Sequence, residues 1–242
     1  MAQVQAAAAG RGYTGKILRV NLSTGAISVE EPGDLFYRTY MGGWGYIGYY
    51  LLKELAPGVE PLGPENKLIF ATGVVTGTAI GGSGRSAVGA KSPLTGAFGA
   101  AEAGGWFGAE LKAAGYDAVI VEGQSAEPVY LWIRDGEAAL RPAGHLWGRL
   151  TADVQAALRQ ELGDNRVRVA QIGPAGEQLA RIAAVMHDTN RAAGRGGLGA
   201  VMGAKRLRAV AVRGTQRVEV ADRAALQALA RWYAGYWSSS WA

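Results

Sequence analysis

The sequence contains no cysteine and only two histidines, His145 and His187. Without cysteine, this chain cannot form a disulfide, hold zinc or an iron–sulfur cluster through thiolates, or use a cysteine nucleophile. The two histidines lie far apart in the sequence, so a local histidine-based metal motif is absent as well. No Ser-His-Asp order and no pair of catalytic carboxylates emerges. This composition indicates a binding platform rather than a complete active site.

Long apolar runs are also missing. No window approaches the roughly 18 apolar residues of a membrane-spanning helix, and the start, MAQVQAAAAGRGYTG, lacks the basic segment and apolar core of a signal peptide. We therefore expect a cytoplasmic protein without a membrane span. The net charge is only +5, from 25 basic and 20 acidic side chains. This modest excess suits an anionic ligand and does not indicate a nucleic-acid-binding protein.

Glycine is the residue in excess. It occupies 37 of 242 positions, about twice its usual share of about 7%. Such a composition indicates many tight turns or close approaches of the backbone to another group. Hydrophobic residues make up 49% of the chain, which is enough to build the core of one large domain or two small ones.

The order of apolar and turn-forming segments predicts a mixture of strands and helices. Strands are expected over 16–22, 26–30, 67–73, 117–123, 166–173, 178–186 and 206–214, and hairpins over 86–103 and 128–143. Helices are expected over 34–55, 105–115, 150–163 with Thr151 as N-cap, 197–205 and 221–236. A Gly-Gly pair, a helix and an apolar strand ending in glycine recur from Gly42, Gly104 and Gly196. This repeat predicts an α+β fold of duplicated sheet and helix units, whose glycine-rich helix starts face one shared site.

The segment RAAGRGGLGAVMG, at 191–203, contains the dinucleotide fingerprint G-x-G-x-x-G. A chain this rich in glycine produces the match by chance, and a second copy starts at Gly43. The fingerprint also needs a strand directly before its first glycine and an acidic residue about 20 positions later. Both are missing here, which disfavours a nicotinamide site.

Two arginines in this segment, Arg191 and Arg195, instead favour a phosphate or another anion at a glycine-rich helix start. The loop over 80–96 repeats the composition with Arg85 and Lys91. The alternative is a set of tight turns with solvated basic side chains.

Three further features each allow two interpretations, and we expect the first in each case. Glu102, just before a helix start, is a capping carboxylate or a ligand contact. The His187-Asp188 pair is a polar turn or a proton relay. Four tryptophans are core residues or flat surfaces on which a ligand stacks, namely Trp44, Trp106, Trp132 and Trp147.

Taken together, several segments resemble the N-terminal domain of the tungsten-containing aldehyde:ferredoxin oxidoreductase family. They are GKILRVNLSTG (15–25), PENKLIFATGVVTGT (64–78), GRSAVGAKSPLTGAF (84–98), AGGWFGAELKAAGYDAVIVEG (103–123), IGPAGE (172–177) and NRAAGRGGLGAVMGAKRLRAVAV (190–212). They follow one another from about residue 12 to 222 with few gaps. This density makes the resemblance far more specific than one glycine motif.

The resemblance implies an enzyme that oxidises aldehydes to carboxylic acids and passes electrons to ferredoxin. Members of the family hold tungsten, or molybdenum, through the dithiolenes of two pterins, and a [4Fe-4S] cluster lies close by. Their N-terminal domain forms the base under this tungstopterin, with a pseudo-twofold pair of β-sheets that agrees with the repeat above. We accordingly expect residues 13–220 to be the tungstopterin-binding domain, after a flexible tail at 1–12.

By motif, the resemblance assigns cofactor contacts to Arg85, Glu102, Gly104, Arg191, Ala192, Gly194 and Arg195. Arg85 would lie between a pterin and the cluster, and the RAAGR segment at 191–195 would grip the pterin phosphates. Main-chain oxygens of Glu102 and Ala192 would coordinate a magnesium ion that bridges the two phosphates. Glu102 replaces an asparagine found in some relatives, so an added carboxylate near the phosphates would need neutralising.

The chain also departs from the family, whose members are much longer and draw their cluster cysteines and acid/base side chains from later domains. We therefore expect the cluster to bind only together with further domains, from the same enzyme or a split partner subunit. Residues 221–242 would begin a linker or helix toward a second domain, as expected of a truncated chain, a gene fragment or half of a split enzyme. The rival hypothesis is a non-catalytic assembly protein, whose exposed apolar face forms an oligomer such as a homodimer.

Overall fold

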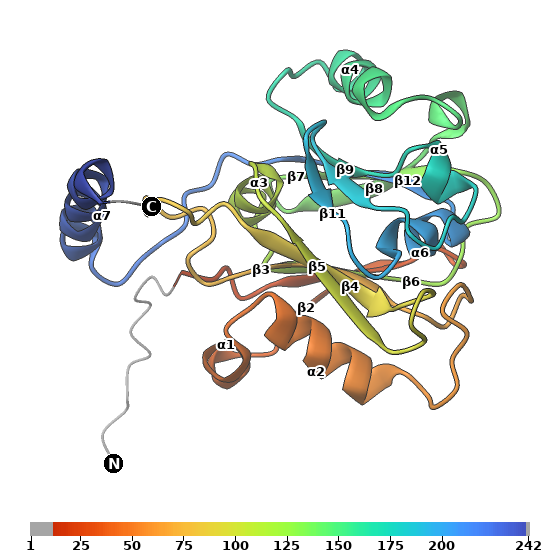
Figure 1. The fold of residues 1–242 in the computed structure, drawn as a ribbon, viewed down its shortest axis with the longest axis horizontal. Coiled ribbons are helices and arrows are strands. Elements are labelled where there is room, and N and C mark those ends of the chain that lie inside the picture. Colours follow the sequence, from red (N-terminus) through yellow and green to blue (C-terminus); the bar gives the residue numbers. More distant parts are fainter. Residues whose placement is uncertain (1–11, 241–242) are drawn as a thin grey trace.

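The computed structural model describes residues 12–240, which form two six-stranded β-sheets and seven α-helices (Figure 1). The elements of the first half are β1 (Ile17–Asn21), β2 (Ile27–Glu30), α1 (Asp34–Tyr40), α2 (Trp44–Glu54), β3 (Leu68–Thr72), β4 (Ser86–Lys91), β5 (Phe98–Ala103), α3 (Phe107–Ala113) and β6 (Ala118–Glu122). Those of the second half are β7 (Val129–Arg134), β8 (Glu137–Pro142), a short 3-10 helix (Gly144–Leu146), α4 (Thr151–Leu162), β9 (Arg168–Gln171), α5 (Pro174–Glu177), β10 (Val185–His187), β11 (Arg191–Ala193), α6 (Leu198–Ala204) and β12 (Leu207–Arg213). Helix α7 (Arg223–Ser239) follows both halves.

The two halves share one topology. The strand order is β2-β1-β6-β3-β4-β5 in the first sheet and β8-β7-β12-β9-β10-β11 in the second, so each strand has its counterpart six strands later. In both sheets the first and sixth strands of the half, β1 with β6 and β7 with β12, pair in parallel. All the other neighbours are antiparallel. The predicted duplicated α+β fold is confirmed.

Only two of the three Gly-Gly repeats are equivalent, however. Gly104-Gly105 precedes α3 and β6, and Gly196-Gly197 precedes α6 and β12, which hold the same place in the two halves. Gly42-Gly43 precedes α2, which joins the second strand of its half to the third. The prediction of a third copy of the unit is therefore wrong, because this pair belongs to a different connection.

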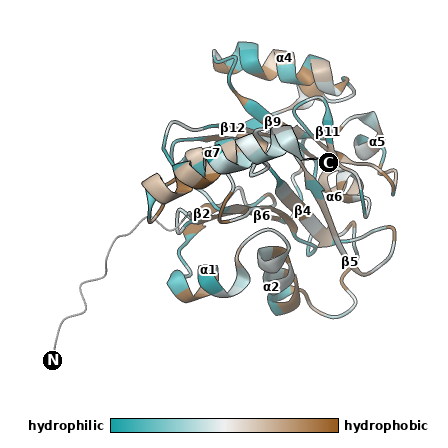
Figure 2. Cartoon of the chain, turned by 60° about the vertical axis from the view of Figure 1, so that its left-hand side comes forward, coloured by the Kyte–Doolittle hydropathy of each residue, from teal (hydrophilic) through white to brown (hydrophobic). Residues whose placement is uncertain are grey.

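The main core lies between the two sheets. Its residues come from both sheets and from α3 and α6, as Phe70, Val210, Phe107 and Met202 illustrate. Helices α1 and α2 cover the outer face of the first sheet, and α4 covers the outer face of the second (Figure 1). Because both faces are covered, β3 and β6 are apolar along almost their whole length. Figure 2 shows these hydrophobic residues along β6 and hydrophilic ones on α1 and along α4.

Two buried ion pairs tie connecting loops to this core. Lys112 Nζ lies 3.8 Å from an Asp117 carboxylate oxygen, and both side chains are buried. Burial lowers the pKa of Lys112 to about 8, while the charge of Asp117 acts in the opposite direction. In the second half, Arg208 Nε lies 2.8 Å from a Glu177 carboxylate oxygen. The guanidinium of Arg208 also donates to the main-chain oxygen of Arg149, which holds the loop before α4.

The strand predicted over 178–186 is mostly absent, because only its end forms β10. Leu179 takes a left-handed conformation with φ of 57°. The segment then turns toward α6, where the Gly199 N–H donates to the Ala183 carbonyl at 2.9 Å. Local turn hydrogen bonds and this one bond to the α6 start therefore replace the pairing that a longer strand would have made.

Two smaller differences concern a helix start and an unexpected strand. Thr151 is the first residue of α4, and the N-cap is Leu150, which makes no side-chain capping hydrogen bond. Thr151 is held by a different contact, in which its main-chain oxygen accepts a hydrogen bond from Gln171 Nε2 at 3.0 Å. The three residues Arg191–Ala193, expected in a turn, pair with β10 as strand β11.

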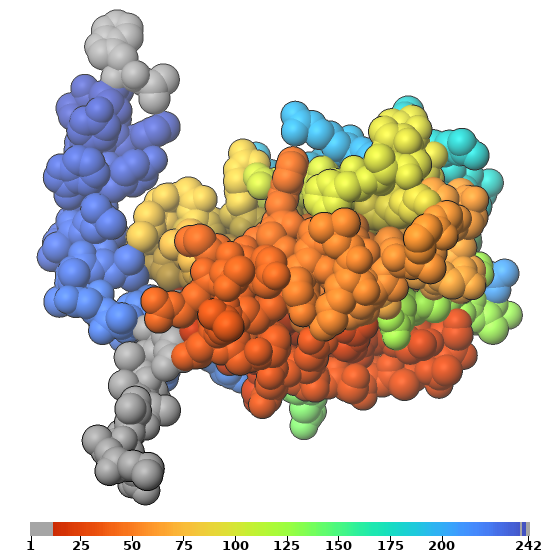
Figure 3. Space-filling view, turned by 90° about the horizontal axis from the view of Figure 1, so that it is seen from below, coloured from red at the N-terminus to blue at the C-terminus, as the bar shows by residue number. Residues whose placement is uncertain are grey.

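The first described residue pairs with the segment that leads into α7. Of the predicted tail, residues 1–11 lie outside the described residues, as do 241–242, whereas the Gly12 N–H donates to the Glu219 carbonyl at 2.8 Å. Helix α7 stands beside the two halves as a separate column (Figure 3). None of the helices in the described range is long and apolar enough to cross a membrane.

Candidate functional site

The edge strands of the two sheets, β5 and β11, contact each other. Glu102 and Ala192 are the last residues but one of these strands, and Gly104 and Gly194 follow the strands directly. The predicted contacts from two segments far apart in sequence therefore hold equivalent places in the two halves. The duplication of the fold brings them to one location.

A hollow of about 500 Å³ opens at this location. Its lining residues are Gly82, Gly84, Arg85, Glu102, Ala103, Gly104, Gly105, Asn190, Arg191 and Ala192. Five of the seven residues predicted to contact a cofactor are thus brought together around one space. Gly194 and Arg195 are exposed and adjoin β11 but do not line this hollow. Gly82, Gly84 and Asn190 also line it, although the motifs assigned no contact to them; Gly84 and Asn190 each directly precede an arginine of the hollow in the sequence.

The charges of the hollow come from two arginines and one glutamate. Ala87 of β4 is the register partner of Glu102, so Arg85 and Glu102 are diagonal neighbours on one face of the sheet. Their closest nitrogen and oxygen lie 3.8 Å apart, and the side chains are 68% and 46% exposed. Such an exposed ion pair is weak. The guanidinium of Arg85 therefore stays available to an anion, together with Arg191.

Two glycines at this location are not explained by packing. An ideal Cβ on Gly104 would meet no atom within 4 Å, and one on Gly194 would meet only Ala192 Cβ, at 3.8 Å. Neither residue has a φ in the left-handed region. The protein itself therefore requires glycine at neither place. The missing side chain of Gly104 leaves open space beside the hollow. Gly194, the equivalent residue of the second half, likewise has open space where a side chain would lie.

The glycines of the α6 start have a different role from the one we expected. An ideal Cβ on Gly197 would lie 2.1 Å from the Arg181 carbonyl oxygen, and one on Gly199 would lie 2.5 Å from that of Ala184. All seven residues of α6 are buried. These glycines let α6 pack against the segment before β10, so the helix start does not serve as an open anion cradle. The cationic hollow lies at the ends of β5 and β11 instead.

Each half of the fold has one further hollow at an equivalent place. The first, of about 280 Å³, lies between the start of α2 and the strands β3 and β4, and it shares Gly82, Arg85 and Glu102 with the central hollow. The second, of about 450 Å³, lies at the start of α4, at α5 and at the start of β10. Strand and helix order assign these hollows to the same position in the two halves. The first hollow is lined by the charged residues Arg85 and Glu102. No charged residue lines the second hollow.

Two of the tryptophans are not core residues. Trp44 is 49% exposed and lines the hollow beside α2, and Trp106 is 64% exposed. The guanidinium carbon of Arg168 lies 5.7 Å from the centre of the Trp106 ring. Trp132 and Trp147 do pack against the core, as expected. The difference arises because the first two follow Gly-Gly pairs at the open ends of the strands.

The His187-Asp188 pair is not a relay, because His187 ends strand β10 and Asp188 begins the turn toward β11. His187 is fully buried, its ring lies 4.7 Å from that of Phe107, and neither ring nitrogen has a hydrogen-bond partner among the described residues. Burial lowers the pKa of His187 to about 3, so the ring is neutral. Asp188 has a left-handed φ of 53° and accepts from the Val169 N–H at 3.4 Å. The expected polar turn thus holds for Asp188, whereas His187 is a buried strand residue.

Metal ligands are scarce. No three His, Asp or Glu side chains within residues 12–240 are grouped so that they could hold a metal ion. A metal in this location would therefore need main-chain oxygens or ligands that come with a cofactor. The open, glycine-lined and net cationic hollow fits a phosphate-bearing group better than a bare cation.

A family model, the aldehyde ferredoxin oxidoreductase N-terminal domain, matches residues 17–214. The chain belongs to this family. The match starts at the first residue of β1 and ends one residue after β12, so it covers both halves of the duplicated fold. The resemblance found in the sequence motifs is confirmed.

Relatives of known name agree with this membership. The tungsten-containing aldehyde ferredoxin oxidoreductases of Thermococcus kodakarensis and Pyrococcus abyssi are 52% and 54% identical over 212 residues, which is 88% of this chain and 35% of each relative. The aliphatic sulfonate oxidoreductase, WOR-like subunit, of Pyrococcus furiosus is 34% identical over 235 residues, 90% of this chain and 37% of the relative. The chain thus spans about a third of the length of the curated relatives it matches.

A solved structure shares the fold. It is the active site complex BamBC of benzoyl coenzyme A reductase in complex with 1,5 dienoyl-CoA, to which this chain is 39% identical with a TM-score of 0.84. The similarity covers 86% of this chain and 32% of that one.

Proposed function

We propose that this domain, residues 13–220, is the base on which a bis-pterin tungsten or molybdenum cofactor lies. The observation that carries the proposal is the pair Gly104 and Gly194, which neither packing nor backbone conformation requires. They lie at equivalent positions beside a cationic hollow. A twofold-repeated protein site suits a ligand with two similar halves, and the hollows beside α2 and α4 would each take one pterin.

The charged residues would hold the phosphates of such a cofactor. Arg85 and Arg191 line the central hollow, and Arg195 is an exposed residue two positions after the end of β11. Guanidinium groups bind phosphate oxygens in a bidentate manner. Main-chain oxygens of Glu102 and Ala192 would coordinate a magnesium ion between the two phosphates. This ion would also offset the repulsion between the Glu102 carboxylate and a phosphate.

The activity belongs to a larger assembly. We propose oxidation of aldehydes to carboxylic acids with ferredoxin as the electron acceptor, because tungsten-containing aldehyde ferredoxin oxidoreductases are 52% and 54% identical to this chain. The bound metal would supply the two-electron chemistry, whereas this domain binds and orients the cofactor and excludes water from beneath it. A [4Fe-4S] cluster would be held by further domains or a partner subunit, because this chain has no cysteine.

Cofactor retention tests the proposal. The 242-residue chain is purified from cells that make the pterin cofactor, and tungsten, molybdenum and pterin are measured, with and without the remaining domains supplied in trans. We expect retained pterin that is lost in Arg85→Gln and Arg191→Gln but kept in the control Arg134→Gln, an exposed arginine outside the hollows. Absence of pterin under both conditions would refute the proposal. An oligomer without pterin would favour the assembly hypothesis.

A further inference from the structure

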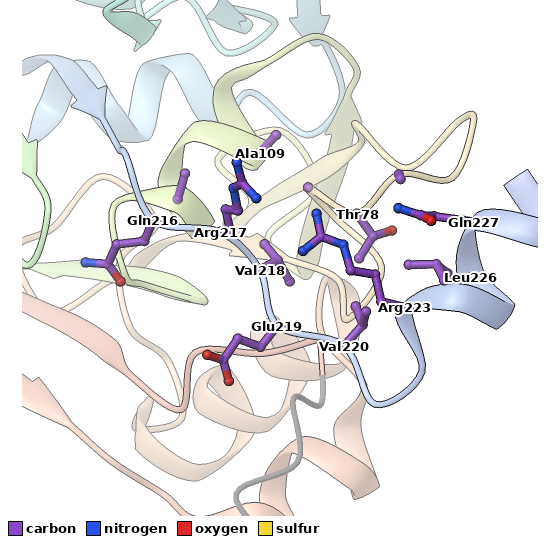
Figure 4. Close-up of a pocket in the computed structure, with 13 residues that line it drawn as sticks. Thr78, Ala109, Gln216, Arg217, Val218, Glu219, Val220, Arg223, Leu226 and Gln227 are labelled. Carbon is purple, nitrogen blue, oxygen red and sulfur yellow. The ribbon is translucent and has the colours of Figure 1, made fainter.

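A second kind of cavity lies between α7 and the body of the protein, outside the site described above. It has a volume of about 780 Å³, within the usual range of about 300–1,000 Å³ for small-molecule sites. Three parts of the chain build it: the loop 77–79, one side of α3, and the segment 216–227 that leads into α7. Figure 4 shows this arrangement.

The walls of the cavity are fixed by contacts of the protein itself. The Gln216 N–H donates to the Ala113 carbonyl at 3.0 Å, and the Glu219 carbonyl accepts from Gly12. Asp222 caps α7 by accepting from the Ala225 N–H at 2.8 Å. An ideal Cβ on Gly81 would lie 3.0 Å from the ring of Tyr233, so α7 also touches the loop before β4. The cavity therefore exists without a ligand to hold it open.

Two guanidinium groups give the cavity its charge. Arg217 and Arg223 both line it, and neither guanidinium group makes a hydrogen bond or ion pair within residues 12–240. In Figure 4 both side chains reach up toward α3 and the loop that carries Thr78, whereas the carboxylate of Glu219 points away. Arg213, a few residues earlier, is by contrast paired with Glu110 and Asp164. With two arginines and one glutamate, the lining carries a net positive charge, and no ion pair in the described part of the chain joins Glu219 to either arginine.

The remaining lining combines small and apolar residues with four polar side chains, those of Thr78, Gln216, Glu219 and Gln227. Gly77, Ala79, Ala109 and Ala113 contribute almost no side-chain volume, and Val218 and Leu226 add apolar surface. Gly77 has a φ of 79°, and an ideal Cβ there would lie 3.2 Å from Val218. The small and apolar residues of the loop and α3, beside two guanidinium groups, suit an anionic group on a partly apolar body.

We propose that this cavity binds a small organic anion, with a carboxylate or phosphate held by Arg217 and Arg223 and its apolar part on the floor formed by the loop and α3. This cavity and the hollow beside α2 have no lining residue in common, but one segment of the chain contributes to both. The segment between β3 and β4 provides Gly77 and Thr78 to this cavity, and Thr76 and Arg85 to the other. An occupant would therefore contact the same loop that carries Arg85.

Calorimetric titration of the full 242-residue chain with aromatic probes tests this site. The probes are 1-naphthoate, 1-naphthyl phosphate and the neutral 1-naphthamide, and the relative affinity of the first two shows which anionic group is preferred. We expect one anion per chain, and at least tenfold weaker binding of the amide. The Arg217→Gln/Arg223→Gln double variant should also bind the anions at least tenfold more weakly. Arg231→Gln, which removes an exposed arginine of α7 outside the cavity, is the matched control and should bind as the parent does.

Two further variants test whether the anion lies in this cavity and not in the cofactor site. Ala109→Leu fills the floor without changing charge and should abolish anion binding while thermal unfolding stays cooperative. Arg85→Gln lies in the other hollow and should leave naphthoate binding unchanged, which separates this proposal from that of the cofactor site. The proposal is overturned if neither anion binds at millimolar concentration, if the amide binds equally well, or if only Arg85→Gln weakens binding.

Discussion

Replacing Gly104 by alanine should separate folding from cofactor binding. An ideal Cβ at this position meets no protein atom within 4 Å, and φ lies outside the left-handed region. The folded chain can therefore accept the methyl group without strain. The same group would occupy space beside the hollow that Arg85, Arg191 and Glu102 line. Gly104→Ala should thus change the free energy of unfolding and the affinity for the cofactor in opposite directions.

The two magnitudes can be estimated separately. A glycine replaced by alanine at a compatible position stabilises a protein by about 0.4–1 kcal/mol, because the unfolded chain loses freedom. For a chain of this size, 1 kcal/mol corresponds to about 2–4 °C in Tm. A methyl group forced against a tightly held ligand costs about 1–3 kcal/mol, which corresponds to roughly 5- to 150-fold weaker binding.

Thermal unfolding and pterin content of the purified variant provide the assay. We expect an equal or higher Tm together with lower pterin retention, and the same pair of results for Gly194→Ala at the equivalent position. Gly203→Ala is the matched control, because an ideal Cβ there would lie 1.9 Å from the Gly176 carbonyl oxygen. This control should lower the Tm strongly. A lower Tm for Gly104→Ala would show that the fold requires this glycine, and full pterin retention would show that the cofactor lies elsewhere.

Three more predictions concern ionisable groups. Arg208→Met should lower the free energy of unfolding by about 3–5 kcal/mol in urea titrations, since it leaves the buried Glu177 carboxylate unpaired; a loss below about 1 kcal/mol would contradict this. Burial lowers the pKa of His187 to about 3, so the unfolded chain binds a proton between this value and 6.5 that the folded chain does not. The free energy of unfolding should therefore decrease as the pH is lowered from 6.5 toward 3, by up to about 1.4 kcal/mol per pH unit. His187→Leu should flatten this pH profile; an unchanged slope would exclude His187 as its cause. Glu102→Gln should change stability by less than about 1 kcal/mol but tighten pyrophosphate binding in calorimetry, because it removes a like charge; weaker binding would mean that the carboxylate itself helps to hold the ligand.

Local patterns were sufficient to predict most of the elements. The apolar runs over 67–73 and 117–123 correspond to β3 and β6, and the hairpin expected over 128–143 forms from β7 and β8, which turn at Asp135-Gly136. These predictions succeed because side-chain periodicity and turn chemistry depend on neighbouring residues. The prediction for 178–186 fails because most of this segment forms turns and one hydrogen bond to the distant α6 start, and local periodicity does not reveal such a contact.

Family membership, too, could be inferred from the order of motifs, but the roles of individual residues could not. Gly104 and Gly203 look alike in the sequence, yet one borders open space and the other lies against the Gly176 carbonyl oxygen. Trp44 and Trp132 likewise differ only in what distant segments place over them. The amino-acid order shows where a side chain is missing or large. Whether the protein or a ligand fills the adjoining space depends on segments far apart in the chain, and these meet only in the folded structure.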